Sequence, residues 1–152
     1  WPCRGIAVVV CPAGRACAGA AFSPDLTRAD SSQIDAGHGL VGTLFPQPWL
    51  SGNTAPCRMD ERWGTGWRVV LAAAAPPEAS AATATFNAMP LKVCQLGQTG
   101  FVETEGVVSN WFHDHQVMAA LIRPDHCVYA VAKHAEELRT QLAHLQQTLT
   151  AP

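Results

Sequence analysis

Residues 119–132 limit the possible folds more than any other part of the chain. They form two short apolar runs separated by Arg123-Pro124-Asp125. Proline presets a turn backbone and aspartate can bond the nearby main chain, so the runs are predicted to form a β-hairpin. A strand that is apolar on both faces belongs to a sheet covered on both sides, which indicates an α/β fold. Strict alternation places two sets of side chains on opposite faces of the second strand: Cys127, Tyr129 and Val131, and Val128, Ala130 and Ala132.

The composition is that of a globular domain. The chain has 152 residues, of which 48% are hydrophobic, and a formal net charge of −2. No basic surplus favours nucleic acid or an anionic membrane surface as a partner. The longest apolar runs, 6–11 and 69–75, are too short to span a bilayer. Pro12 and Gly14 interrupt the first run and argue against a signal peptide, so a cytoplasmic protein is expected.

Two regions differ in amino-acid composition and periodicity. Residues 1–40 are dominated by Gly, Ala, Pro, Ser and Asp, with little periodicity. They are interpreted as a linker-like N-terminal arm. Residues 41–150 are expected to form the folded domain.

Periodicity predicts the order of elements in that domain. Residues 42–50 are expected to be extended, 59–64 to be a short helix, and 67–72 and 91–96 to be strands. Residues 80–89 are ambiguous. Two later segments have apolar residues at helical spacing: 105–115, with Val107, Val108, Trp111 and Phe112, and 135–149, with Leu138, Leu142, Leu145 and Leu149. This order is that of a thioredoxin-like α/β fold, with a central mixed sheet, a C-terminal β-hairpin and flanking helices.

Thiol redox chemistry is the first function to consider for such a fold. It needs a low-pKa cysteine at a helix start, usually in Cys-x-x-Cys after the central strand. Positions 73–77 there are Ala-Ala-Ala-Pro-Pro. The six cysteines are expected to be reduced and structural: Cys3, Cys11, Cys17, Cys57, Cys94 and Cys127.

Other chemistries also lack a complete set of residues. His113 and His115 point to different sides of a helix, and no second ligand pair completes a metal site with His126. Residues 64–66, Gly-Thr-Gly, precede a strand and lack the third glycine of a nucleotide loop. The sequence has no Gly-x-Ser-x-Gly elbow. No residue is therefore assigned as catalytic, cofactor-binding or metal-binding.

Several segments together resemble a known family. Residues 42–48 (Gly-Thr-Leu-Phe-Pro-Gln-Pro), 59–61 (Met-Asp-Glu) and 66–70 (Gly-Trp-Arg-Val-Val) resemble the start of the C-terminal domain of FAD-dependent aromatic-ring monooxygenases. Trp111-Phe112 and residues 121–125 with Val128 resemble its end. The most similar subgroup is the 3-(3-hydroxyphenyl)propionate hydroxylase type of the phenol hydroxylase superfamily. The resemblance covers roughly residues 42 to 145.

The resemblance implies a non-catalytic, thioredoxin-like domain without redox cysteines that supports stability or subunit contacts. In the full-length family, FAD, NAD(P)H and substrate belong to preceding domains. No cofactor is expected in this chain, and whether the chain is itself an enzyme stays open. The implied partners are the flavin and substrate domains of a hydroxylase, or a second copy in a homodimer. Contact surfaces are expected on 135–149 and 46–49.

Alternative interpretations remain. The leucines of 135–149 are also explained by burial in the domain's own core. The chain is otherwise a stand-alone binding or oligomerisation module, or a thiol redox protein using a single cysteine such as Cys94 or Cys127. Arg123 and Asp125 are expected to form the turn, with Arg123 pairing with a carboxylate.

Overall fold

The computed structural model describes residues 39–51, 55–98 and 102–150. The expected linker-like arm, 1–40, lies outside these residues except for its last two positions, and Cys3, Cys11 and Cys17 lie outside them entirely. The boundary at residue 41 stays a prediction.

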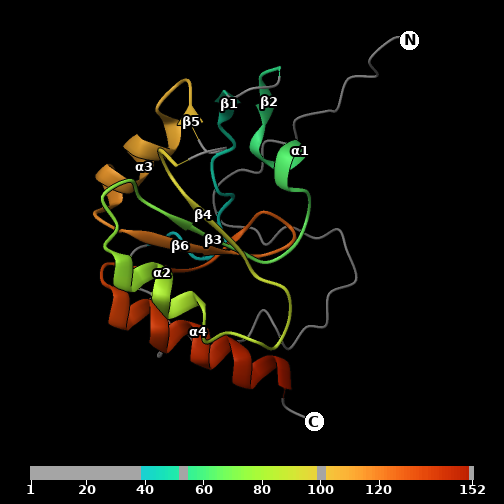
Figure 1. Cartoon of the computed structure of the whole chain (residues 1–152), viewed down its shortest axis with the longest axis vertical. Helices are drawn as coiled ribbons and strands as arrows, with labels where there is room; N and C mark the ends of the chain where they lie inside the picture. Colours follow the sequence, from blue (N-terminus) through green and yellow to red (C-terminus); the bar gives the residue numbers. More distant parts are fainter. Residues whose placement is uncertain (1–38, 52–54, 99–101, 151–152) are drawn as a thin grey trace.

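A four-stranded mixed sheet forms the centre of the domain (Figure 1). Its strand order is β4 (Lys92–Gln95), β3 (Arg68–Leu71), β6 (Ala119–Ile122) and β7 (Val128–Ala132). β3 runs parallel to β4 and antiparallel to β6, and β6 and β7 form an antiparallel hairpin. The α/β class, the mixed sheet and the C-terminal hairpin predicted from the sequence are confirmed.

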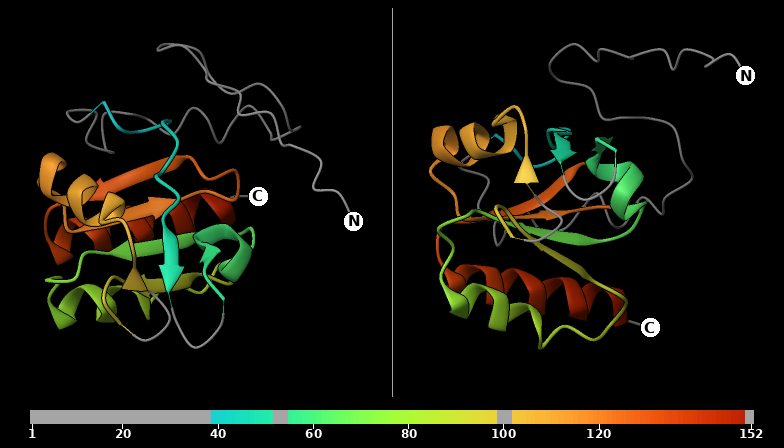
Figure 2. Two further views of the ribbon diagram at one scale, coloured as in Figure 1. Left: turned by 90° about the horizontal axis from the view of Figure 1, so that it is seen from above. Right: turned by 45° about the horizontal axis from the view of Figure 1, so that its top comes forward.

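Two helices, α2 (Pro77–Thr83) and α4 (Ala135–Thr150), pack together beneath one face of this sheet (Figure 2). Pro77 is the first helical residue of α2, where its missing N–H costs nothing and its fixed φ suits the helix. The ambiguous segment 80–89 is therefore helical only at its start. The predicted helix over 135–149 is confirmed.

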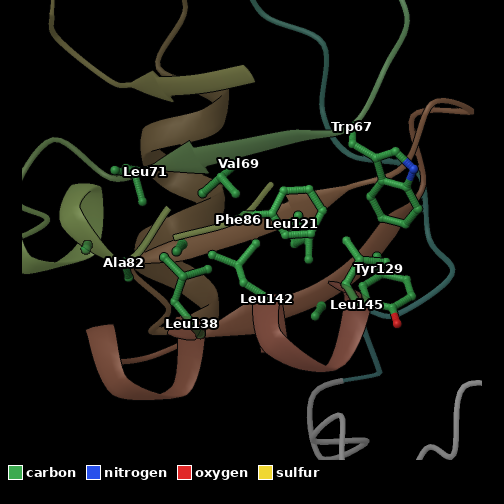
Figure 3. Packing of buried hydrophobic residues seen from close by; sticks show 14 of the residues in the cluster. Trp67, Val69, Leu71, Ala82, Phe86, Leu121, Tyr129, Leu138, Leu142 and Leu145 are labelled. Atoms are coloured by element: carbon green, nitrogen blue, oxygen red, sulfur yellow. The ribbon is translucent and has the colours of Figure 1, made fainter. Parts of the chain in front are cut away.

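The leucines of α4 pack into the apolar core between the sheet and helices α2 and α4 (Figure 3). Leu138, Leu142 and Leu145 are 0%, 2% and 0% exposed, and they pack against side chains from the sheet. The alternative interpretation, burial of these leucines in the domain's own core, is therefore confirmed. A subunit contact through the rest of α4 stays a prediction.

The opposite face of the sheet is covered by smaller elements (Figure 2). They are α1 (Met59–Trp63), α3 (Val107–His115) and a three-stranded antiparallel sheet ordered β2 (Cys57–Arg58), β1 (Trp49–Ser51) and β5 (Val102–Glu103). The short helix α1 was predicted, and Gly64 ends it with φ +63°. The small sheet was not predicted, since strands of two or three residues carry no periodicity.

The side chain of Glu103 fixes the start of α3. Its carboxylate accepts hydrogen bonds from the Val108 and Ser109 N–H groups, both at 2.8 Å. Val108 and Phe112 are buried as expected. Val107 was expected on the same apolar face, but it is 40% exposed, so that part of the prediction is wrong.

A β-bulge changes which residues of β7 face each side of the sheet. Leu121 pairs with Ala130, but the next residue, Ile122, pairs with Val128, so Tyr129 is an extra residue on β7. Tyr129 joins Ala130 and Ala132 in the core beneath α2 and α4, whereas Val128 and Val131 belong to the opposite core. Strict alternation along β7 is therefore wrong, although both of its faces are apolar.

None of the described helices has the length and apolar character needed to cross a membrane.

Candidate functional site

The most unusual residue of the described chain is Arg68, at the start of β3. Its side chain is 1% exposed, although its neighbours along β3 are apolar. Side chains alternate along a strand, so Arg68 shares with Val70 the face covered by α1 and α3. Sequence reasoning missed this residue because an arginine beside an apolar run is normally expected to reach water.

The Arg68 guanidinium joins two loops. Its Nη2 atom donates a hydrogen bond to the Gly64 carbonyl at 2.9 Å and lies 3.2 Å from Nδ1 of His126. Arginine has no acceptor, so the His126 Nδ1 atom must be the acceptor of this contact. The ring is then neutral, with its proton on Nε2.

Gln47 extends these contacts to α1. Its Nε2 atom lies 3.5 Å from the same His126 Nδ1 atom, and its carbonyl accepts a hydrogen bond from Nη1 of Arg58 at 2.7 Å. The Arg58 guanidinium lies over the Trp49 ring, 4.5 Å from the centroid. We call the residues Arg58, Gln47, His126, Arg68 and Gly64 the Arg68 network. It ties the β6–β7 turn to β3, to the start of α1 and to the segment before β1.

The electrostatics of the network are set by burial. Burial lowers the pKa of Arg68, while Cys94 and Asp60 act in the opposite direction. Burial raises the pKa of the Cys94 thiol to about 11, so this thiol is neutral near pH 7 and supplies no negative charge. The pKa of His126 is lowered by burial and then by the positive charge of Arg68. No carboxylate of the described residues lies within ion-pair distance of the Arg68 guanidinium.

Three buried polar atoms in or beside the network have no hydrogen-bond partner among the described residues. They are Gln47 Oε1, Arg62 Nη1 and Arg68 Nη1. All three are shut off from the surface, so a ligand would reach them only after the structure moved. The Arg68 network therefore has the geometry of a structural contact between elements rather than that of an open ligand pocket.

The turn beside His126 has the predicted form. Arg123 Nη2 pairs with Asp125 Oδ2 at 2.6 Å, and the other carboxylate oxygen accepts a hydrogen bond from the Cys127 N–H at 3.1 Å. His126 itself has φ +67°, a left-handed conformation that is uncommon outside glycine and asparagine. The expected turn-forming roles of Arg123 and Asp125 are confirmed.

The histidines considered as metal ligands are not brought together. His113 is exposed and contacts its neighbour Asp114 at 3.4 Å, whereas the His115 ring packs against the Trp111 ring. His126 contacts Arg68 instead. Within residues 39–51, 55–98 and 102–150, no group of three or more metal-ligating side chains occurs.

The described cysteines, Cys57, Cys94 and Cys127, form no disulfide with one another. Their expected reduced, structural state stays a prediction. Cys94 and Cys127 are buried, and Cys127 precedes β7 rather than lying in it.

A shallow hollow of about 330 Å³ lies between the end of β3 and α3. Its walls are largely apolar, and Ser109 and His113 are the polar side chains that line it. The apolar lining includes Ala72, Ala73, Ala74, Leu96, Phe112 and Met118. It contains no cysteine or carboxylate to carry out chemistry.

Comparison with protein families identifies a matching domain model. The model of the HcaD C-terminal domain matches residues 42–148. A probable NADH-specific resorcinol 4-hydroxylase of Rhodococcus jostii is 34% identical over 108 residues, which are 64% of this chain and 20% of that protein.

Two solved structures share the fold. Aklavinone-11 hydroxylase, in a ternary complex with FAD and aklavinone, superposes with a TM-score of 0.55 at 22% identity, over 71% of this chain and 21% of that one. The flavin-dependent monooxygenase PieE, in complex with FAD and substrate, gives a TM-score of 0.54 at 21% identity, over 74% and 20%. The chain spans about a fifth of the length of these relatives.

Proposed function

Because the chain belongs to the family of HcaD C-terminal domains, we propose that it is the non-catalytic C-terminal domain of a cytoplasmic, FAD-dependent monooxygenase that hydroxylates phenolic compounds. The observation that carries the proposal is the similarity to the resorcinol 4-hydroxylase relative. That similarity covers 64% of this chain and only a fifth of the relative. The remaining four fifths of such a protein would hold the flavin and the substrate.

The residues of this chain do not fit FAD or NAD(P)H. A dinucleotide needs a glycine-rich turn that opens a helix. Residues 37–42 have the Gly-x-Gly-x-x-Gly spacing, but Gly42 leads into the extended segment 42–48 rather than into a helix. The buried arginine nitrogens that could face a pyrophosphate, Arg62 Nη1 and Arg68 Nη1, are closed to a ligand. No step of a hydroxylation is therefore derived from these residues.

We further propose that the domain is thioredoxin-like. The β3–α2–β4 unit is parallel, and the β6–β7 hairpin and α4 follow it. The strand order β4-β3-β6-β7 puts the first strand of this unit beside the hairpin. In such a fold the redox cysteines would lie between β3 and α2, where residues 73–77 are Ala-Ala-Ala-Pro-Pro. The buried, neutral Cys94 also argues against a single-cysteine redox protein.

The proposed role is to stabilise the larger protein or to form subunit contacts. The leucines of α4 are already covered, so the surface must lie elsewhere. Leu44 and Val41, which run beside the edge strand β7, are 59% and 45% exposed. Trp49, on the previously expected segment 46–49, is half-buried. We assign the contact to residues 41–49.

Two measurements test this function. The open reading frame upstream of Trp1 should encode a flavin-binding part, and the intact mass of the natural protein should include it. Light scattering during size-exclusion chromatography should show self-association of the chain at high concentration. The Leu44→Ser variant should weaken that association, whereas Val93→Ser, 42% exposed on the other edge strand, should not. A strict monomer would contradict the subunit-contact role.

A further inference from the structure

We propose that His126 makes the attachment of residues 42–48 to the main sheet sensitive to pH. While its ring is neutral, His126 holds Arg68 and Gln47 through one nitrogen atom. When the ring is protonated, both contacts are lost and the segment 42–48 detaches more readily. The inference concerns the fold of this chain and does not depend on the proposed function.

The segment 42–48 lies along β7 at the edge of the main sheet. Gly42 N–H donates to the Val128 carbonyl at 2.8 Å, and Phe45 N–H donates to the His126 carbonyl at 2.9 Å. In the other direction, Val128 N–H donates to the Thr43 carbonyl at 2.8 Å. The attachment therefore consists of a few hydrogen bonds, and two of its anchors, Val128 and His126, belong to the hairpin.

Both neighbours of His126 Nδ1 are hydrogen-bond donors. Arg68 Nη2 lies 3.2 Å away and Gln47 Nε2 lies 3.5 Å away. A proton on Nδ1 would point a third donor at these two groups and place a second positive charge beside the guanidinium. Since Gln47 belongs to the segment 42–48, the loss of its contact acts directly on the attachment.

The other charged groups around His126 do not offset this repulsion. Asp125 on the same turn would favour protonation, but its two oxygens are engaged by Arg123 and by the Cys127 N–H. Asp60 on α1 also favours protonation, and one of its oxygens accepts a hydrogen bond from the Glu61 N–H. The remaining cations of the surrounding elements donate elsewhere, Arg58 to the Gln47 carbonyl and Lys92 of β4 to the Trp63 carbonyl.

The sign of the pH effect follows from these contacts. Burial and the charge of Arg68 hold the pKa of folded His126 below the ordinary value of 6.5. The detached or unfolded form therefore binds protons more readily than the attached form. The stabilisation is fully present above pH 6.5 and is lost as the pH falls from there through the pKa of the folded state.

The matched variant is His126→Asn. Asparagine tolerates the positive φ of this position and carries an acceptor oxygen close to the place of Nδ1, but it does not titrate. His113→Asn is the control, because His113 is an exposed histidine on α3 whose ring lies 3.4 Å from Asp114 and outside the Arg68 network.

Hydrogen exchange of the Gly42 and Phe45 amides measures the attachment. In the full chain we expect their protection factors to fall several-fold between about pH 7.5 and about pH 5, because protonation of His126 favours the detached form. The same fall in His113→Asn and its absence in His126→Asn would support the proposal. An equal fall in His126→Asn would overturn it.

A second measurement uses the unaltered chain. Nitrogen-15 spectra of the imidazole at about pH 7.5 should show His126 with its proton on Nε2, and its titration midpoint should lie below the ordinary histidine value of 6.5. A proton on Nδ1, or a midpoint above that ordinary value, would overturn the proposal whether or not the variant folds.

Discussion

The two faces of the β4-β3-β6-β7 sheet are built differently from the same strands. Beneath α2 and α4, the buried polar side chains are neutral, and Thr83 and Gln141 each donate to a backbone carbonyl. Beneath α1 and α3, the same strand β3 buries the charged Arg68. Alternation along one strand thus supplies an apolar core on one side and a polar connection between loops on the other.

The two faces are held together by different kinds of interaction. The α2/α4 face is stabilised by the removal of apolar surface from water. This hydrophobic effect is non-directional, so it tolerates small shifts of the packed elements. The α1/α3 face depends on directed contacts from Arg68 to Gly64 and His126, at 2.9 and 3.2 Å. Such contacts add little net stability but fix which loops meet.

The largest effect is expected from Leu142→Ala on the α2/α4 face. Leu142 is 2% exposed, so the substitution removes buried methyl groups and leaves a cavity. We expect a loss of about 2–5 kcal/mol in the free energy of unfolding, measured by denaturant titration. Leu149→Ala is the matched control, because the same change at a half-buried position of the same helix should cost less. Equal losses would contradict the assigned core.

Arg68→Ala tests the opposite face and should have an intermediate effect. It removes the donor to the Gly64 carbonyl and to His126, and unpaired buried acceptors cost about 1–3 kcal/mol. Arg68→Met keeps most of the volume and removes a buried charge that has no ion-pair partner among the described residues, so its cost should be smaller. If Arg68→Met destabilised the domain as much as Leu142→Ala, the contrast between the faces would be wrong.

Glu103→Ala should have the smallest of these effects. Its carboxylate accepts hydrogen bonds from two N–H groups at the start of α3. Losing such a cap costs about 1 kcal/mol, measured by the same denaturant titration. Glu105→Ala, an exposed acidic residue before the same helix, is the control and should change the free energy of unfolding by less. Indistinguishable values for the two variants would show that Glu103 does not cap the helix.

Features set by local patterns were predictable from the sequence. The turn at Arg123-Pro124-Asp125 and the leucine spacing of α4 each involve residues close in the chain, and both predictions are confirmed. The resemblance to a C-terminal domain of aromatic hydroxylases is also confirmed by the match over residues 42–148 and by the similarity to the resorcinol hydroxylase relative.

Features that depend on distant partners were not predictable. Arg68 and His126 are 58 residues apart, and nothing in the sequence marks them as neighbours. The bulge at Tyr129 arises from the pairing of β6 with β7. It places Val128 and Tyr129 on the sides opposite to those that strict alternation assigns relative to the rest of β7. Val107 was misplaced because it is the first residue of α3 and lies on the solvent side, whereas the next residue, Val108, is buried. The Arg68 network was therefore found only in the folded chain.

The central claim is that this domain supports a flavoprotein and does not itself hold the flavin. Titration of the purified chain with FAD, followed by flavin absorbance and fluorescence, tests it most directly. We expect no saturable change in the flavin signal and no flavin retained after gel filtration. Retention of one flavin per chain would contradict the claim, because it would require a binding site that the described residues do not provide.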